Sequence, residues 1–209
     1  MKDNNSKQVL LSVLGVAILV VAVVGVSFAA FTFSQTGNVE NKITTGIISM
    51  TYTEPENGIN LTNAMPMTDD SGKVLTADNE KFDFTVTATI QDGGAGTVIN
   101  YALAATTTEG ATLKDQYVKV YLTDQDDAPI GDYAKAAKTV ESLQDGTGAS
   151  DAAGVPENQK VLYRSTYKAT TTSSYRLRMW VSEDYPIDTA SGSETYTLRV
   201  NVYGKANAQ

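Results

Sequence analysis

Residues Lys81 to Gln91 read KFDFTVTATIQ, and this stretch decides the fold class. Apolar residues occupy every second position from Phe82 to Ile90, with Asp83 and three threonines between them. Successive side chains of a strand point to opposite faces, so this alternation predicts a strand with one buried face. A turn sequence, QDGGAG, follows at 91–96.

The same alternation recurs and predicts at least seven strands. The further strands are expected at 44–53, 97–106, 116–124, 160–169, 175–181 and 195–203. Because only a short turn separates the 81–91 and 97–106 strands, we expect them to form a hairpin. The C-terminal residues 204–209 are expected to follow the last strand as a tail.

One segment breaks the strand pattern. Ala136, Val140 and Leu143 have helical spacing, and Asp132 can cap a helix over 132–143. The small, polar residues 145–159 predict a loop. The whole pattern predicts an all-β fold: a two-sheet antiparallel sandwich, jelly-roll-like, with one short helix. An N-terminal hydrophobic helix is expected to precede it.

The composition excludes several functions. The 209 residues include no cysteine and no histidine, and the net charge is −8. Disulfides, thiolate metal sites, a Ser-His-Asp triad and an HExxH zinc site are therefore impossible. An acidic chain repels phosphate backbones, so nucleic acid is not an expected partner. We expect no cofactor, no small-molecule substrate and no enzymatic activity.

An uncharged apolar run extends from Val9 to Phe33. It exceeds the roughly 20 residues that a membrane-crossing helix needs. Ser27 and Ala29 are spaced like the recognition residues of signal peptidase, so cleavage before Ala30 is expected. An uncleaved signal anchor is the alternative. The expected organisation is a leader at 1–29, an extended segment at 30–43 and a β-domain at 44–209.

The junction between leader and domain resembles the TasA–camelysin family. The matching features are the GVSFAAFT sequence at 25–32 and the NKITTGIISM sequence at 41–50. The resemblance implies an exported, fibre-forming surface or biofilm-matrix protein of Gram-positive bacteria. Metalloprotease activity described for some camelysins does not carry over, because this chain has no histidine.

The resemblance also implies that the N-terminal segment of one subunit adds a strand to the next. The candidate donor strand comprises Ala30, Phe31, Thr32, Phe33 and Ser34, in which two phenylalanines alternate with polar residues. Such head-to-tail contacts propagate instead of closing. The competing interpretation is that both phenylalanines belong to the end of the membrane helix.

Three other groups of residues are candidates for binding. The acidic loop Asp124 to Asp127 could bind calcium but lacks EF-hand spacing, so a solvated turn is the alternative. Trp180 is expected on an outward strand face, where an aromatic residue can mark a carbohydrate platform. Four arginines are also expected on outward faces, either as a docking stripe or as a solvated surface; they are Arg164, Arg176, Arg178 and Arg199.

The predicted function is a structural subunit of an extracellular or cell-surface fibre. Its expected partners are other copies of the chain, and the membrane where the leader is retained. The alternatives are a membrane-anchored surface or virion protein that displays the sandwich, and a carbohydrate- or surface-binding module.

Overall fold

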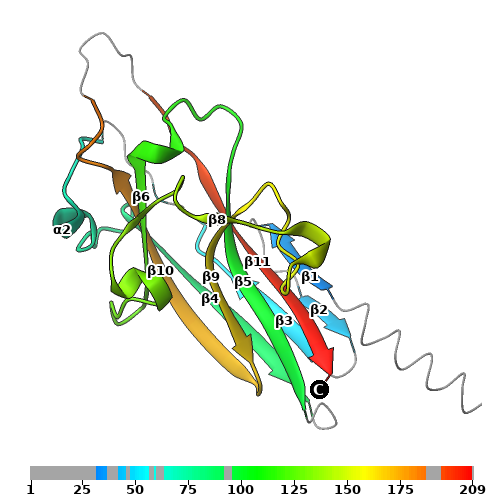
Figure 1. Ribbon diagram of the computed structural model, residues 1–209. Coiled ribbons are helices and arrows are strands. Elements are labelled where there is room, and N and C mark those ends of the chain that lie inside the picture. Colours follow the sequence, from blue (N-terminus) through cyan, green and yellow to red (C-terminus); the bar gives the residue numbers. More distant parts are fainter. Residues whose placement is uncertain are drawn as a thin grey trace, which may run out of the picture.

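Two antiparallel sheets pack against each other in the computed structural model (Figure 1). The structure describes residues 32–36, 42–45, 48–56, 59, 64–91, 96–186 and 194–208, with backbone pairing alone for 32–36 and 42–45. This arrangement confirms the predicted all-β sandwich.

Every pairing between two of the named strands that the structure describes is antiparallel. Sheet A runs in the order β1 (Thr32–Thr36), β11 (Leu198–Ala208), β5 (Thr97–Thr107), β9 (Lys160–Tyr167) and β8 (Gln144–Asp145). Sheet B runs in the order β2 (Lys42–Thr45), β3 (Ile48–Thr53), β4 (Lys81–Ile90), β10 (Thr171–Val181), β6 (Val118–Asp124) and β7 (Lys138–Thr139). The two sheets form the layers of the sandwich.

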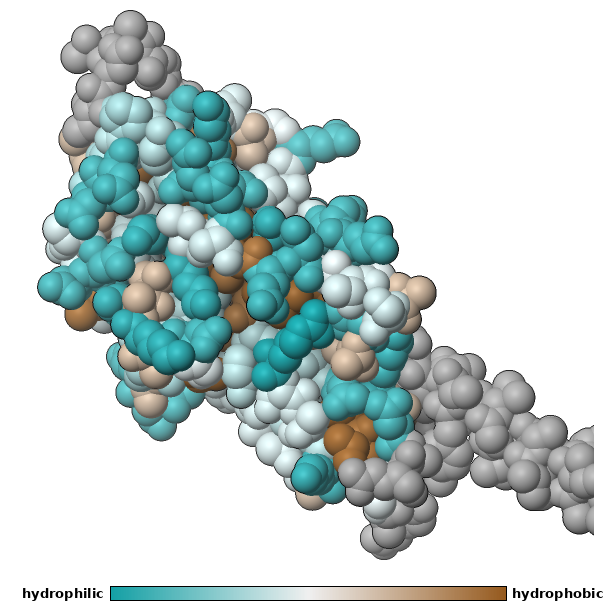
Figure 2. All heavy atoms as spheres, viewed as in Figure 1, coloured by the Kyte–Doolittle hydropathy of each residue, from teal (hydrophilic) through white to brown (hydrophobic). Residues whose placement is uncertain are grey.

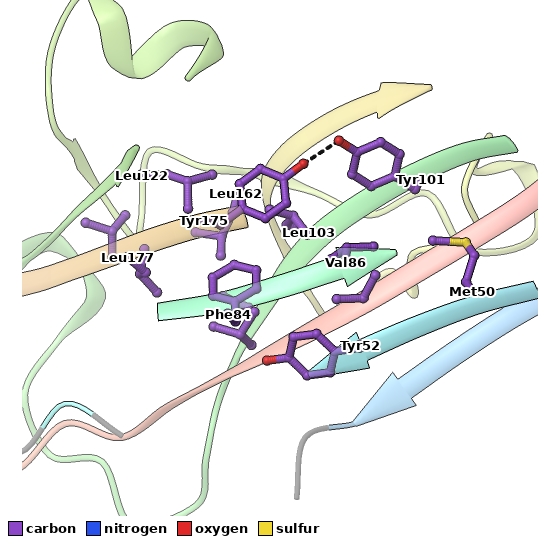
Figure 3. Close-up of a cluster of buried hydrophobic side chains, with 14 of the residues drawn as sticks. Met50, Tyr52, Phe84, Val86, Tyr101, Leu103, Leu122, Leu162, Tyr175 and Leu177 are labelled. Atoms are coloured by element: carbon purple, nitrogen blue, oxygen red, sulfur yellow. Dashed lines mark hydrogen bonds between the residues drawn. The ribbon is translucent and has the colours of Figure 1, made fainter. Parts of the chain in front are cut away.

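The core lies between the inner faces of the two sheets (Figure 3). In β4 the alternation works as predicted, because Phe84, Val86 and Ala88 are buried while the threonines between them are partly exposed. Leu103 from sheet A and Leu177 from sheet B are buried in the same cluster. Apolar burial of this kind is the main favourable term in folding.

The predicted hairpin between 81–91 and 97–106 is wrong. Strand β4 pairs with β3 and β10 in sheet B, whereas β5 pairs with β11 and β9 in sheet A. The chain therefore crosses from one sheet to the other between these strands. Both strands still bury their apolar faces in the same core.

The predicted helix over 132–143 is also wrong. A 3₁₀ turn, η2 (Gly131–Ala134), is followed by the two-residue strand β7. Val140 and Leu143 are buried as expected, but Ala136 is exposed. The α-helix within the described residues is a single turn elsewhere, α2 (Asp69–Gly72), capped by Thr68. Two further 3₁₀ turns are η1 (Asp115–Tyr117) and η3 (Gly148–Ser150).

A bulge in β9 changes which residues face the core. The pairing with β5 shifts between Leu103 and Ala104, so Leu162 rather than Val161 enters the main core. Val161 instead packs on the outer face of sheet A, against a loop that contains Ala153 and Val155. One extra residue in a strand produces this reversal of faces.

Strand β11 continues beyond the predicted end of the last strand. Gly204 to Ala208 remain paired with β5, as far as the pair Ala208↔Thr97. Residues 204–208 of the expected tail are therefore part of sheet A, and Gln209 lies outside the described residues.

Candidate functional site: the N-terminal strand on the edge of sheet A

The structure describes part of the predicted donor strand. Thr32, Phe33 and Ser34 lie in β1, at the edge of sheet A, whereas Ala30 and Phe31 lie outside the described residues. Ser27 and Ala29 of the predicted cleavage site lie outside them too. Phe33 belongs to a strand, so the interpretation that it ends a helix does not hold in this structure.

Strand β1 pairs with β11 of the same chain. The register runs from Thr32↔Lys205 to Thr36↔Asn201, and Phe33 stands opposite Gly204. Figure 1 shows β1 in blue beside β11 in red, at the side of the sheet away from β8. Without β1, the backbone of 201–205 would become an open strand edge.

Gly204 marks a close approach of the two sheets beneath this edge. A Cβ atom at this position would collide with Met50 of β3 and lie 3.6 Å from Cγ2 of Ile99. Gly204 thus lies on the interior face of β11, the face that carries Val202. The register places residue 33 directly opposite this point of close approach.

Strand β11 is held by contacts that do not involve β1. The Asn201 Nδ2 atom donates to Thr106 Oγ1 at 2.9 Å and to Gln159 Oε1 at 3.0 Å. Gln159 Nε2 donates to the Tyr203 hydroxyl at 2.6 Å, and Lys205 Nζ donates to the Asp151 carbonyl at 2.8 Å. These bonds position the edge whether or not β1 occupies it.

Asp151 anchors the loop to which Lys205 is tied. Its buried carboxylate accepts hydrogen bonds from the backbone N–H groups of Ala153 at 2.9 Å and Gly154 at 3.0 Å. Both terminal nitrogens of Arg164 also donate to it. The Arg164 guanidinium, followed by the backbone donors, holds the pKa of Asp151 well below its usual range.

The four arginines do not form one stripe, so this part of the outward-face prediction is wrong. Arg164 lies on sheet A and pairs with Asp151, and Arg199 is exposed on β11. Arg176 and Arg178 lie on the outer face of sheet B, where both donate to Asp127 Oδ1. Arg178 is buried and also donates to the Leu75 carbonyl at 2.7 Å.

Trp180 is buried, which contradicts its predicted exposure. Only 1% of its surface is accessible, because the α2 segment covers it and Gly72 rests against its ring. In this structure Trp180 offers no exposed platform for a carbohydrate.

The acidic loop makes internal contacts. Asp124 Oδ1 accepts from the backbone N–H groups of Asp126 at 3.0 Å and Ala128 at 2.8 Å. Asp127 adopts a φ of 65° and binds the two arginines. Among the described residues, there is no cluster of three or more acidic side chains that could hold a metal ion.

The sequence predicts a strand that includes Thr32, Phe33 and Ser34, but it does not indicate the edge on which this strand lies. Gly204 and Lys205 resemble a tail after the last strand, and only their pairing with β5 and β1 reveals their role. The continued alternation from Val200 through Val202 to Ala206 was the available signal.

No model of a known protein family matches the sequence, and no curated protein matches it. Within the part of the chain that the structure describes, no helix has the length and hydrophobicity needed to cross a membrane.

Proposed function

We propose that this protein is a structural subunit of an extracellular or cell-surface fibre. The observation that carries the proposal is the position of β1, a terminal edge strand held by one neighbour, β11. The resemblance of residues 7–53 to the TasA–camelysin family supports the same function. The proposed role is structural, so the other copies of the chain are the partners.

Assembly proceeds by exchange of β1 between copies. Residues 37–41 connect β1 to β2, and redirecting this connection lets β1 pair with β11 of the next subunit instead of its own. The same register, Thr32↔Lys205 to Thr36↔Asn201, then forms between chains. Each subunit donates one strand and accepts another, so the contact is head-to-tail and open-ended.

The composition of the surface favours assembly of copies through a strand edge over assembly through an apolar surface patch. Figure 2 shows a face that is mostly hydrophilic, with apolar residues in small separate patches. Among the described residues, the large apolar side chains that are strongly exposed are Met65 and Val74. A stable association therefore needs another source of affinity, and main-chain hydrogen bonds along a strand supply it.

Replacing Phe33 with Asp tests the proposal. Residue 33 stands opposite Gly204 in the register, and Gly204 is where Met50 and Ile99 approach β11 from the core. A carboxylate there loses its hydration without gaining a partner, which opposes strand insertion. We expect Phe33→Asp to abolish fibres in electron micrographs while the circular dichroism of the β-domain is retained.

Thr32→Asp is the matched control, because it adds the same charge one residue earlier, opposite Lys205. We expect this variant to form fibres. Fibres of Phe33→Asp as abundant as those of the unaltered protein would refute strand donation by β1.

A further inference from the structure

A cleft of about 460 Å³ opens between β9 and β10, on the side of the sandwich away from β1. Its volume falls within the roughly 300–1,000 Å³ that is typical of small-ligand sites. Four tyrosines line it, and Ser165, Lys168 and Asp124 are also among its lining residues; the tyrosines are Tyr101, Tyr163, Tyr167 and Tyr175.

The cleft exists because two neighbouring strands end early. Strand β6 ends at Asp124, opposite Tyr175, so Thr171–Ser174 of β10 pair with β4 alone. Strand β8 pairs with β9 at Lys160 and Val161. Within the described residues, no strand pairs with the remainder of this edge of β9. The sandwich is therefore open along this side.

Three of the four tyrosines, Tyr101, Tyr167 and Tyr175, belong to the buried core and form the inner side of the cleft. The rings of Tyr101 and Tyr167 stack with centroids 4.3 Å apart and an interplanar angle of 3°. The Tyr101 and Tyr175 hydroxyl oxygens lie 2.5 Å apart and share a hydrogen bond across the two sheets (Figure 3). Burial raises the pKa of both hydroxyls well above the usual value, so they stay protonated.

The accessible hydroxyls of the cleft come from serine and threonine. The hydroxyls of Tyr101 and Tyr175 are buried and bond to each other, so they stiffen the inner side of the cleft. Further hydroxyls line the cleft on Ser165 and Thr166 of β9 and on Ser173 and Ser174 of β10. These hydroxyls can both donate and accept hydrogen bonds.

We propose that this cleft binds a neutral oligosaccharide. Sugar hydroxyls both donate and accept, which matches the serine and threonine hydroxyls that line the cleft on both strands. Lys168 and Asp124 carry the formal charges among the described lining residues, so the lining has no excess charge to select a phosphate or a polyanion. The open side leaves room for a chain of sugars to extend beyond the cleft.

The test is titration calorimetry of the full-length protein with hexasaccharides of the cellulose, laminarin, xylan and chitin series. We expect saturable binding of at least one of them with a Kd of about 1 mM or tighter. The double variant Ser165→Ala/Ser173→Ala should weaken binding roughly two- to tenfold, because it removes two hydroxyls that line the cleft, one from each sheet.

Ser165→Trp fills the cleft from a position between Tyr163 and Tyr167 on the same face of β9, and should abolish binding. Thr53→Trp is the control, since Thr53 is exposed on β3 and does not line the cleft. Failure of all four sugars to bind would overturn the proposal, as would binding that survives Ser165→Trp. Binding of a peptide with the sequence of residues 30–37, without any sugar binding, would reassign the cleft to strand addition.

Discussion

At the scale of single residues, Asp151 organises the loop on the outer face of sheet A. Its carboxylate accepts hydrogen bonds from the loop backbone and from Arg164. Asp151 is 3% exposed, and its partners include the backbone of the loop and both terminal nitrogens of Arg164. Through the carbonyl of the same residue the loop reaches Lys205 on β11. Asp151 therefore holds the loop together with its carboxylate and ties it to β11 with its main-chain carbonyl.

Asp151→Asn should lower the free energy of unfolding by about 3 kcal/mol at pH 7, because Arg164 loses its charged partner. The lowered pKa of Asp151 means that its ionised form stabilises the fold above the unfolded pKa of about 3.9, and this stabilisation is lost as the pH falls below it. Urea unfolding should show a constant difference between variant and unaltered protein from about pH 5 to 8, and a shrinking one below about pH 4.

Asp145→Asn is the control for this prediction. Asp145 pairs with Lys160 at 2.8 Å, but its side chain is 62% exposed. Exposed pairs contribute little, so the loss should stay below about 1 kcal/mol. A similar loss in both variants, or a difference for Asp151→Asn that does not change with pH, would contradict the proposed role of the buried carboxylate.

Two residues of β10, Trp180 and Arg178, show what the sequence pattern can and cannot predict. Alternation correctly put Trp180 and Arg178 on the face of β10 opposite to Leu177. It could not show that the segment around α2 folds over that face, because such covering depends on contacts between distant parts of the chain. Both residues are consequently buried and not exposed.

At the scale of elements, strand positions were predictable and strand partners were not. The period of two identifies β4 and β5, since each buries a regular apolar face. A short glycine-rich connection suits a hairpin, yet here it joins strands in different sheets. The sequence does not indicate the bulge in β9 either, because Val161 and Leu162 are both apolar and either could enter the core.

Helix α2 is a short element with a specific packing contact. A Cβ atom on Gly72 would overlap the Trp180 ring, so Gly72→Ala should lower the free energy of unfolding by about 1–3 kcal/mol. Trp180→Leu makes room for the methyl group, and the double variant should therefore lose less than the sum of the two single losses. A double-mutant cycle by urea unfolding measures this coupling.

Asp70→Ala provides the comparison for α2, because Asp70 is exposed on the same helical turn. We expect it to change stability by no more than about 0.5 kcal/mol. Strict additivity of Gly72→Ala and Trp180→Leu would show that α2 does not pack on Trp180 as described.

At the scale of the whole molecule, the two sides of the sandwich differ in structure. On one side β1 completes sheet A by pairing with β11, and on the other the strands end early around the tyrosine-lined cleft. The first side serves the proposed assembly, and the second serves the proposed binding of sugars. The net charge of −8 opposes contacts between copies, and strand pairing must overcome this repulsion.

The most direct measurement of strand exchange is disulfide cross-linking with Thr32→Cys/Lys205→Cys. The chain has no cysteine, and these residues face each other in the β1–β11 register. In fibres, oxidation should produce a ladder of covalent multimers on a non-reducing gel, whereas Thr32→Cys/Asn207→Cys, two residues out of register, should give far less cross-linking. Fibres that dissolve entirely into internally cross-linked monomers would show that β1 stays on its own subunit, and would contradict assembly by strand donation.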